Sequence, residues 1–442
     1  MSWAERFDMI IKFHALTKYF AIFILAFLMT DFTLSPEAQS SEIEPSKLKE
    51  IEKNWPRFRG PNGLGISFCT NIPTSWNGKT GEGILWKKEV PLPGENSPIL
   101  WGDRVFVTGA NKEKREVYCF DANSGDMLWR KPVDNISSES DYRNLRESSV
   151  LTASTSATDG ERIFSIFANG DIFCLDFDGN SIWSKCIGPI KNDFGHASSL
   201  LVHQDNLIIQ LDQGFEDDEL SKIVALRTNN GDMVWSTKRK LPTSWSTPIV
   251  IDTGKRHEII TCANPCVIAY EPLTGKELWR VQCLGGEVAL SPVYSDGLVF
   301  VANAMALCAA IRPGGQGDVT ITHVVWTIGD ILADICSPLA TGDFLYLLES
   351  GGYLFCYDAQ TGKTIWEHDL ENGFTASPSL VGDHIYLLAE DGVMTIINND
   401  REFKEIEKCE LGDKTLATPA FSDGKIYIRG ENNLFCIGHN RM

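Results

Sequence analysis

One segment of this chain recurs, and its recurrence constrains the fold more than any other feature. A small residue is followed by glycine six positions later and by tryptophan ten positions later, as in CFDANSGDMLW (119–129), ALRTNNGDMVW (225–235), AYEPLTGKELW (269–279) and CYDAQTGKTIW (356–366). CLDFDGNSIW (174–183) is the same unit with one residue deleted. Such self-similarity indicates an array of similar structural units.

Each part of the repeat has a mechanical interpretation. The apolar alternation before the turn predicts a β-strand, and the turn predicts a hairpin in which glycine adopts positive φ, at Gly125, Gly231, Gly275 and Gly362. An acidic residue two positions after the small residue is expected to accept backbone N–H groups at the corner, at Asp121, Glu271 and Asp358. The tryptophan offers a large apolar face for packing.

A second recurring piece precedes each such unit. It consists of a short apolar strand, a Gly-Asp or Asp-Gly turn and another strand, as in SPILWGDRVFV (97–107), SPVYSDGLVFV (291–301), SPSLVGDHIYLL (377–388) and TPAFSDGKIYI (418–428). The two pieces together predict four antiparallel strands, which make one propeller blade.

The tryptophans count the blades. Six blades close at separations of 54, 52, 44, 47 and 40 residues, on Trp129, Trp183, Trp235, Trp279, Trp326 and Trp366. A seventh has Ile406 where tryptophan would fall, and the eighth stops after LFCIG (434–438), one strand short. Ile84-Leu85-Trp86 matches the missing strand. We therefore predict an all-β chain forming an eight-bladed β-propeller over 84–440, closed by pairing of its N- and C-terminal strands, since an open ring would expose two strand edges.

The N-terminal 40 residues are expected to be a signal peptide. Basic residues precede an eleven-residue apolar run (19–29), which is shorter than a membrane span, and Ala38-Gln39-Ser40 would permit cleavage before Ser41. An uncleaved anchor, which would be the protein's one membrane contact, and a start at Met9 stay open. Residues 41–83 are predicted to form an N-terminal segment that packs on the propeller, in an exported, periplasmic or extracellular protein.

Charge and cysteine usage exclude some functions. A net charge of −19 argues against nucleic-acid binding and fits either solubility or selection of basic partners. Cysteine at the repeat's small-residue position alternates with alanine, which predicts buried thiols rather than disulfides, at Cys119, Cys174, Cys356 and Cys436. Cys262 and Cys266 leave a local disulfide or half a metal site open, but no partner pair at zinc-site spacing accompanies them, so no metal is expected.

The repeats resemble the pyrroloquinoline-quinone repeat, with its Ala-x-Asp-x-x-x-Gly-x-x-x-Trp core. NWPRFRGPNGLGIS (54–67), PTSWN (73–77), PTSWSTPIV (242–250) and IRPGGQGDVT (311–320) are similar to segments of a group of bacterial exported propellers. The resemblance covers about residues 54–438. It implies the quinoprotein-like propeller fold.

For function, the resemblance implies two classes. Some members are quinone-dependent alcohol or sugar dehydrogenases, with the quinone, a calcium ion and often a disulfide of adjacent cysteines at the channel mouth. This chain has no Cys-Cys dipeptide, and the calcium-binding set has no matching motif. Other members, like the outer-membrane assembly propeller lipoprotein, bind no quinone and act as docking platforms. The departures favour this second class.

Propeller geometry predicts which residues surround the channel mouth. They lie just before each innermost strand, and the polar, acidic and aromatic candidates are Glu95, Thr152, His196, Trp245, Asp334 and Thr375. His196 suits a general base or ligand, against a loop histidine bonded to backbone. Trp245 suits a stacking platform, against packing between blades. No catalytic residue is assigned.

Three other features have structural interpretations. Asp212 is expected to cap a strand turn, and Arg57, Arg59 and Asn62 are expected to clamp the N-terminal segment over the ring. The glycine-rich IRPGGQGD is interpreted as a loop of blade five, because it does not lead from a strand into a helix.

Three functional hypotheses follow. The first is a non-catalytic binding or scaffold protein, expected to be a monomer, for a protein, peptide or glycan partner. The second is a quinone-dependent oxidoreductase with pyrroloquinoline quinone and Ca²⁺. The third is an accessory of polysaccharide degradation that recognises sugars through Trp245.

Overall fold

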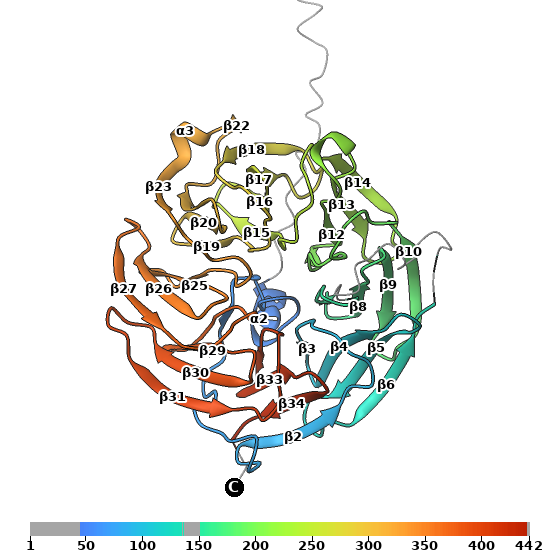
Figure 1. The fold of residues 1–442 in the computed structure, drawn as a ribbon. Coiled ribbons are helices and arrows are strands. Elements are labelled where there is room, and N and C mark those ends of the chain that lie inside the picture. The colour runs from blue at the N-terminus through green and yellow to red at the C-terminus, as the bar shows by residue number, and fades with distance from the viewer. Residues whose placement is uncertain (1–44, 135, 137–150, 440–442) are drawn as a thin grey trace, which may run out of the picture. The chain divides into compact units, whose positions relative to one another are not determined.

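The computed structural model describes residues 45–134, 136 and 151–439. The predicted signal peptide and residues 41–44 lie outside this range. The unit that begins at Pro45 contains eight β-sheets, which follow one another around a central axis (Figure 1). The prediction of an eight-bladed β-propeller is confirmed.

Each blade has four antiparallel strands, which lie side by side in order from the axis outward. Blades 1 to 4 comprise β3 (Ile99–Trp101), β4 (Arg104–Ala110), β5 (Arg115–Asp121) and β6 (Met127–Pro132); β7 (Ala157–Thr158), β8 (Arg162–Ile166), β9 (Asp171–Asp176) and β10 (Ser181–Cys186); β11 (Leu201–His203), β12 (Asn206–Leu211), β13 (Lys222–Arg227) and β14 (Met233–Lys238); and β15 (Ile249–Asp252), β16 (His257–Ala263), β17 (Cys266–Tyr270) and β18 (Glu277–Gln282).

Blades 5 to 8 follow the same plan. They comprise β19 (Val293–Ser295), β20 (Leu298–Ala302), β21 (Leu307–Ile311) and β23 (Val324–Gly329); β24 (Leu339–Ala340), β25 (Phe344–Leu348), β26 (Tyr353–Asp358) and β27 (Thr364–Asp369); β28 (Ser379–Val381), β29 (His384–Leu388), β30 (Val393–Asn398) and β31 (Glu405–Glu410); and β32 (Ala420–Ser422), β33 (Lys425–Arg429), β34 (Asn433–Ile437) and β2 (Ile84–Glu89).

The ring closes as predicted, because β2 pairs antiparallel with β34. Trp86 lies opposite Cys436 and Lys87 opposite Phe435 in this register. The second and third strands of the blades are buried on both faces, whereas the outermost strands alternate towards solvent. The core is therefore distributed over the seams between blades.

The repeat's tryptophan and glycine form the outer part of most seams. In six of the eight seams the indole N–H donates to a backbone carbonyl of the following blade, from Trp86 to Ala122 (3.1 Å), Trp129 to Phe177 (2.7 Å), Trp183 to Thr228 (2.8 Å), Trp235 to Pro272 (3.0 Å), Trp326 to Ala359 (3.0 Å) and Trp366 to Asp400 (3.2 Å). The repeat's glycine has positive φ, as predicted, and also lies beneath the preceding blade's indole. A Cβ on Gly125 would lie 2.5 Å from Cδ2 of Trp86.

The acidic residue of the repeat does accept backbone N–H groups. The Asp121 carboxylate accepts from Asn123 and Ser124, that of Glu271 from Leu273 and that of Asp358 from Thr361. These bonds hold the hairpin corner, as the sequence predicted.

A ring of hydroxyl groups forms the inner part of the seams. In blades 2 to 8, the Ser or Thr that precedes the innermost strand accepts a hydrogen bond from the backbone N–H of its counterpart in the preceding blade. The distances are 2.9–3.0 Å along the series Ser97, Thr155, Ser199, Thr247, Ser291, Ser337, Ser377 and Thr418. The blades are thus joined near the axis by an unbroken chain of seven hydrogen bonds.

Blade 5 departs from the repeat and changes the seam before it. Blade 5 lacks the repeat's glycine. Trp279 of blade 4 therefore does not donate to blade 5 but to the carboxylate of Glu258 in blade 4 (2.7 Å). The segment predicted to be a plain loop of blade 5 contains β22 (Gly317–Asp318), which pairs with β18 at Trp279, and leads into the short helix α3 (Thr320–His323). Through this pairing, β22 becomes the fifth strand of the blade 4 sheet. It lies beside Trp279, which is fully buried.

The N-terminal segment contains α2 (Pro45–Lys53) and β1 (Ile66–Ser67) and contacts the innermost strands of many blades. Trp55 pairs with Leu100 of blade 1, and the Pro56 carbonyl accepts from Thr158 of blade 2. Arg57 donates to the Pro248 carbonyl of blade 4 (2.6 Å). These contacts satisfy backbone groups that an innermost strand would otherwise leave unpaired.

Arg59 continues this pattern on the opposite side. It donates to the Pro338 carbonyl of blade 6 (2.6 Å), and β1 pairs with β28 of blade 7. The predicted clamping role of Arg57 and Arg59 is therefore confirmed, whereas Asn62 is exposed. Burial lowers the pKa of each guanidinium to about 9.

Trp76 packs at the seam between blades 7 and 8, where the repeat's tryptophan is missing. Blade 7 has Ile406 where other blades have tryptophan, and Trp76 is 4% exposed within a cluster that includes Cys409 of blade 7 and Leu434 of blade 8. The backbone N–H of Gly78 donates to the Glu410 carbonyl (2.7 Å). The sequence did not indicate that Trp76 would pack against blades 7 and 8.

The cysteines at the repeat's small-residue position are fully buried, as predicted, and are free thiols: Cys119, Cys174, Cys356 and Cys436. Cys262 and Cys266 are also buried and free. Among the described residues, no group of three or more His, Cys, Asp or Glu could hold a metal ion. In the same part of the chain, no helix is long and apolar enough to cross a membrane.

Candidate binding face at the channel mouth

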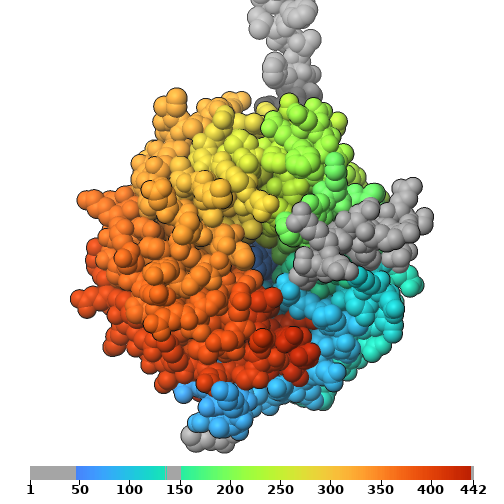
Figure 2. Space-filling view, viewed as in Figure 1, coloured from blue at the N-terminus to red at the C-terminus, as the bar shows by residue number. Residues whose placement is uncertain are grey.

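Strand direction determines which loops share a face. The crossover from each outermost strand to the next blade and the hairpin between each second and third strand open on one side, which we call the mouth face. The N-terminal segment contacts the opposite ends of innermost strands, where Asn54 accepts from Gly102 (2.8 Å) and Ser422 donates to the Lys53 carbonyl (3.0 Å). The central hollow seen from the mouth face ends on this segment, which appears blue in its depth (Figure 2). The channel is therefore a recess with a floor.

A cavity of about 640 Å³ opens on the mouth face between blades 7, 8 and 1. It is lined by three crossovers (93–95, 371–373 and 414–417) and by two hairpins (390–391 and 429–431). Its ionisable groups are five carboxylates and two cations, namely Glu95, Glu371, Glu390, Asp391, Glu431, Lys414 and Arg429. Carboxylates dominate the cavity, so its potential is negative.

Three of the predicted mouth residues lie at or next to this cavity. Glu95 lines it, and burial raises the pKa of Glu95, with Arg429 opposing and Glu390 adding to the effect. Thr375 donates to the Glu390 carboxylate at 2.5 Å. Thr152 is buried, and its hydroxyl lies 2.5 Å from where a Cβ on Gly94 would sit.

Arg429 forms part of the cavity wall and is 1% exposed. Its guanidinium donates to the Leu92 carbonyl (3.0 Å) and to the Thr108 carbonyl, and so links blade 8 to blade 1. Its Nε and the Thr152 hydroxyl are buried and have no hydrogen-bond partner among the described residues. Burial lowers the pKa of Arg429 to about 10, so the group remains charged at neutral pH.

The other predicted residues lie elsewhere on the face. Asp334 accepts from the Ser350 hydroxyl (2.9 Å) and orders a hairpin of blade 6. His196 is 4% exposed, and burial lowers its pKa to about 4, so it is neutral at physiological pH. Trp245 is half-buried, with its indole N–H on Asn192 (3.2 Å) and its ring edge-to-face with Phe194 at 5.7 Å. These residues are not brought together with the cavity.

Sequence reasoning missed most of the cavity wall. Glu390, Asp391, Arg429 and Glu431 lie in hairpins between second and third strands, whereas the predicted mouth residues all lie in crossovers. The same strand-direction argument applies to both kinds of loop. Acidic residues directly after the second strands of blades 7 and 8 were a usable signal.

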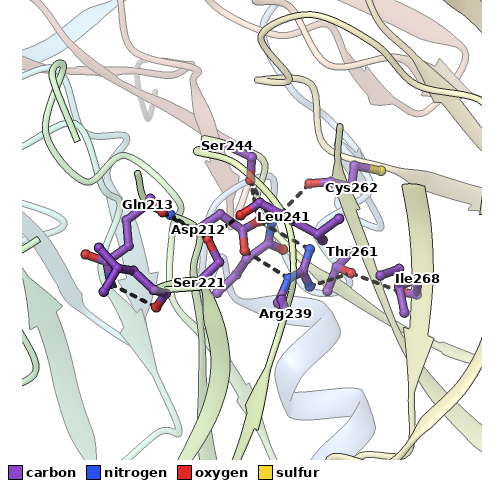
Figure 3. A network of polar contacts seen from close by, with 11 residues as sticks. Asp212, Gln213, Ser221, Arg239, Leu241, Ser244, Thr261, Cys262 and Ile268 are labelled. Atoms are coloured by element: carbon purple, nitrogen blue, oxygen red, sulfur yellow. Dashed lines mark hydrogen bonds and ion pairs between the residues drawn. The ribbon is translucent and has the colours of Figure 1, made fainter. Parts of the chain in front are cut away.

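Asp212 belongs to a buried network rather than to a strand cap, so that prediction was wrong. Its carboxylate lies 2.8 Å from Nε of Arg239 and accepts from the Ser244 hydroxyl (2.6 Å). Arg239 also donates to Thr261 of blade 4, and both members of the ion pair are fully buried (Figure 3). The network joins blades 3 and 4, and its inaccessibility makes it a structural element.

Comparison with known proteins places this architecture in a family. A family model described as "Outer membrane protein assembly factor BamB" matches residues 74–192, 113–252, 219–312 and 322–403. These ranges cover more than half of the chain. The chain belongs to the BamB family of quinone-type repeat propellers.

Individual relatives of this BamB-family chain are distant. BamB of Moranella endobia is 22% identical over 403 residues, which cover 86% of this chain and 88% of the relative. Tetrathionate hydrolase of Acidithiobacillus ferrooxidans is 22% identical over 368 residues, covering 72% and 68%. The curated relatives thus include both an assembly factor and a protein named as an enzyme.

Solved structures agree on the fold of the BamB-family chain. The crystal structure of BamB from Moraxella catarrhalis matches 81% of this chain and 98% of its own, with a TM-score of 0.59 and 15% identity. Quinohemoprotein alcohol dehydrogenase from Comamonas testosteroni matches 91% and 83%, with a TM-score of 0.67 and 12% identity. At these identities the likeness concerns the fold alone.

Proposed function

We propose that this chain is an exported, non-catalytic scaffold protein that binds a polypeptide partner on its mouth face. The observation that carries the proposal is the cavity between blades 7, 8 and 1, which opens on the face opposite the N-terminal segment. The ring that contains this cavity is stabilised by the seven Ser and Thr hydrogen bonds near the axis and by the tryptophan contacts between blades. Membership of the BamB family supports a docking role.

A quinone cofactor is a poor match for the residues around this cavity. Pyrroloquinoline quinone carries several carboxylates of its own, whereas the cavity presents five carboxylates against Lys414 and Arg429. Like charges in a partly desolvated site repel one another. The described residues also contain no group of three or more His, Cys, Asp or Glu that could hold the accompanying calcium ion. We therefore expect that mixing the protein with the quinone and Ca²⁺ leaves the quinone's absorbance spectrum unchanged, and a saturable spectral shift would contradict this.

Site-specific photo-crosslinking in cells of the source organism tests the proposal. A photoreactive side chain at Glu95 or Glu431 should yield a discrete crosslinked polypeptide, because both positions line the cavity. The same side chain at Met233, which is exposed at the start of an outermost strand of blade 3, is the matched control. Crosslinks of equal strength from all three positions, or from Met233 alone, would refute docking at the mouth.

A further inference from the structure

Several exposed apolar side chains lie in the mouth-face loops of blades 5 and 6. We call the set the apolar ledge, and it consists of Met305 (90% exposed), Leu332 (63%), Ile335 (44%) and Tyr353 (48%). Met305 lies in the hairpin between β20 and β21, Leu332 and Ile335 lie in the crossover from blade 5 to blade 6, and Tyr353 begins β26. Grouped exposed apolar side chains of this size mark binding surfaces more often than single ones do.

The part of the ledge at Tyr353 borders a loop that lines the acidic cavity. The Leu370 N–H donates to the Gly352 carbonyl and the Phe374 N–H to the Ser350 carbonyl, both at 3.0 Å. These bonds fix the crossover 370–374 against the hairpin that leads into Tyr353. Residues 371–373 of that crossover also line the cavity. One continuous surface therefore runs from an apolar part on blades 5 and 6 to an acidic part on blades 7, 8 and 1.

The cavity and the ledge together favour a partner that carries two kinds of chemical group. The five carboxylates favour a cation, and an anionic occupant such as a nucleic acid or an acidic lipid headgroup would be repelled. The apolar ledge beside the cavity favours apolar side chains, which a simple amine lacks. A polypeptide satisfies both requirements, with lysine or arginine side chains for the cavity and apolar side chains for the ledge.

We infer that the partner presents a basic amphipathic segment to the mouth face. Its lysine or arginine side chains enter the acidic cavity, and its apolar side chains cover the ledge. The chain's net charge of −19 favours the same partner at longer range. This inference rests on the proposed function and specifies the chemistry of the partner.

Fluorescence anisotropy with the full-length protein and labelled synthetic peptides tests the inference. The probe is an amphipathic Lys/Leu helix of about 18 residues, roughly 27 Å long. Its controls are a scrambled peptide of identical composition and a Glu/Leu peptide of the same pattern. We expect saturable binding of the Lys/Leu helix that weakens at least tenfold from low to high salt, because exposed charge pairs are screened. The scrambled peptide should bind at least tenfold more weakly.

Variants separate the two parts of the surface. The pair Glu390→Gln and Glu431→Gln should weaken binding about tenfold or more and flatten the salt dependence. Glu407→Gln, on the exposed outer edge of blade 7, should leave both unchanged. Leu332→Ser should weaken binding without changing the salt dependence, whereas Met233→Ser should have no effect. Unchanged thermal midpoints confirm that each variant is folded.

Two results would overturn the inference. One is equal binding of the Lys/Leu and Glu/Leu helices, and the other is the absence of binding by all three peptides. If the crosslinks from Glu95 and Glu431 persist in either case, the scaffold function stands and only the partner's chemistry is wrong. If the crosslinks do not depend on position, the scaffold function itself fails.

Discussion

At the scale of single residues, the repeat's glycines and tryptophans form contacting pairs whose two members belong to different blades. Gly125 supplies a positive φ and also leaves room for the indole of Trp86. A side chain at this glycine would therefore meet two separate penalties. They can be separated experimentally, because other glycines of this chain have the same backbone conformation and no neighbour above them.

We predict that Gly125→Ala destabilises the protein more than Gly297→Ala does. Both substitutions impose positive φ on alanine, at 72° and 77°, which costs about 1–2 kcal/mol. Only at Gly125 does the new methyl group displace an indole, since nothing lies within 4 Å at Gly297. The difference in unfolding free energy from urea titration should be roughly 1–3 kcal/mol. Equal losses would mean that the indole moves freely.

Buried histidine predicts an acid-sensitive fold. The folded-state pKa of His196 is about 4, below its ordinary value of 6.5, so the unfolded chain binds the proton more readily. Stability is therefore lost as pH falls from about 6.5 to 4, by about 2–3 kcal/mol at pH 4.5 for this group.

His196→Gln should reduce that loss by the same amount. The measurement compares urea-induced unfolding at pH 7 and pH 4.5 in both proteins. His203, whose pKa burial also lowers to about 4, is present in both and cancels in the comparison. An unchanged pH dependence would show that His196 can take up a proton in the folded state.

At the scale of elements, the N-terminal segment completes blades that the repeats leave unfinished. It contributes the parallel strand β1 to blade 7, it packs Trp76 between blades 7 and 8, and it leads directly into β2, the outermost strand of blade 8. Two arginines satisfy carbonyls of the innermost strands. The segment is therefore part of the propeller's core rather than an appendage.

We predict that Trp76→Ala weakens the contact between residues 77–81 and blade 7. Truncating a buried tryptophan costs about 3–5 kcal/mol. Hydrogen exchange of the Gly78 amide, which donates to the Glu410 carbonyl, should accelerate more than exchange in β12 of blade 3. Uniform acceleration through all blades would indicate global rather than local loosening.

At the scale of the whole molecule, closure makes every blade an interior blade. Because β2 lies far from β34 in sequence, their pairing joins the two ends of the described chain. Without that pairing, β34 and the blade 1 side of the ring would present open edges. The stability of the ring should therefore depend on one terminal strand.

Truncation tests this dependence. A chain starting at Pro91, without the N-terminal segment and β2, should lose its single cooperative unfolding transition and aggregate. A chain starting at Pro45 keeps every described element and should unfold at the full-length midpoint. Calorimetry and light scattering report both outcomes, and a Pro91 chain with an unchanged midpoint would contradict the role of closure.

The fold was predictable further than the candidate site. Blade number followed from the spacing of Trp129 to Trp366, and closure followed from Ile84-Leu85-Trp86, because seams need a large residue at a fixed place in each repeat. The cavity wall lies in loops that the repeat does not constrain, as Glu390 and Glu431 show. The partners of Arg429 are backbone carbonyls, which have no sequence signature. Trp76 was hidden because it lies outside any repeat.

The hydroxyl chain near the axis bears on how such a molecule could have arisen. Every link runs in the same sense, with an amide on one unit and an oxygen on its successor, so each unit carries both halves of the same joint. A gene segment copied in tandem would encode an extra unit that already matches the neighbours on either side. The contacts near the axis would therefore tolerate a change in blade number. The seam at which β2 must pair with β34 would still have to close the ring.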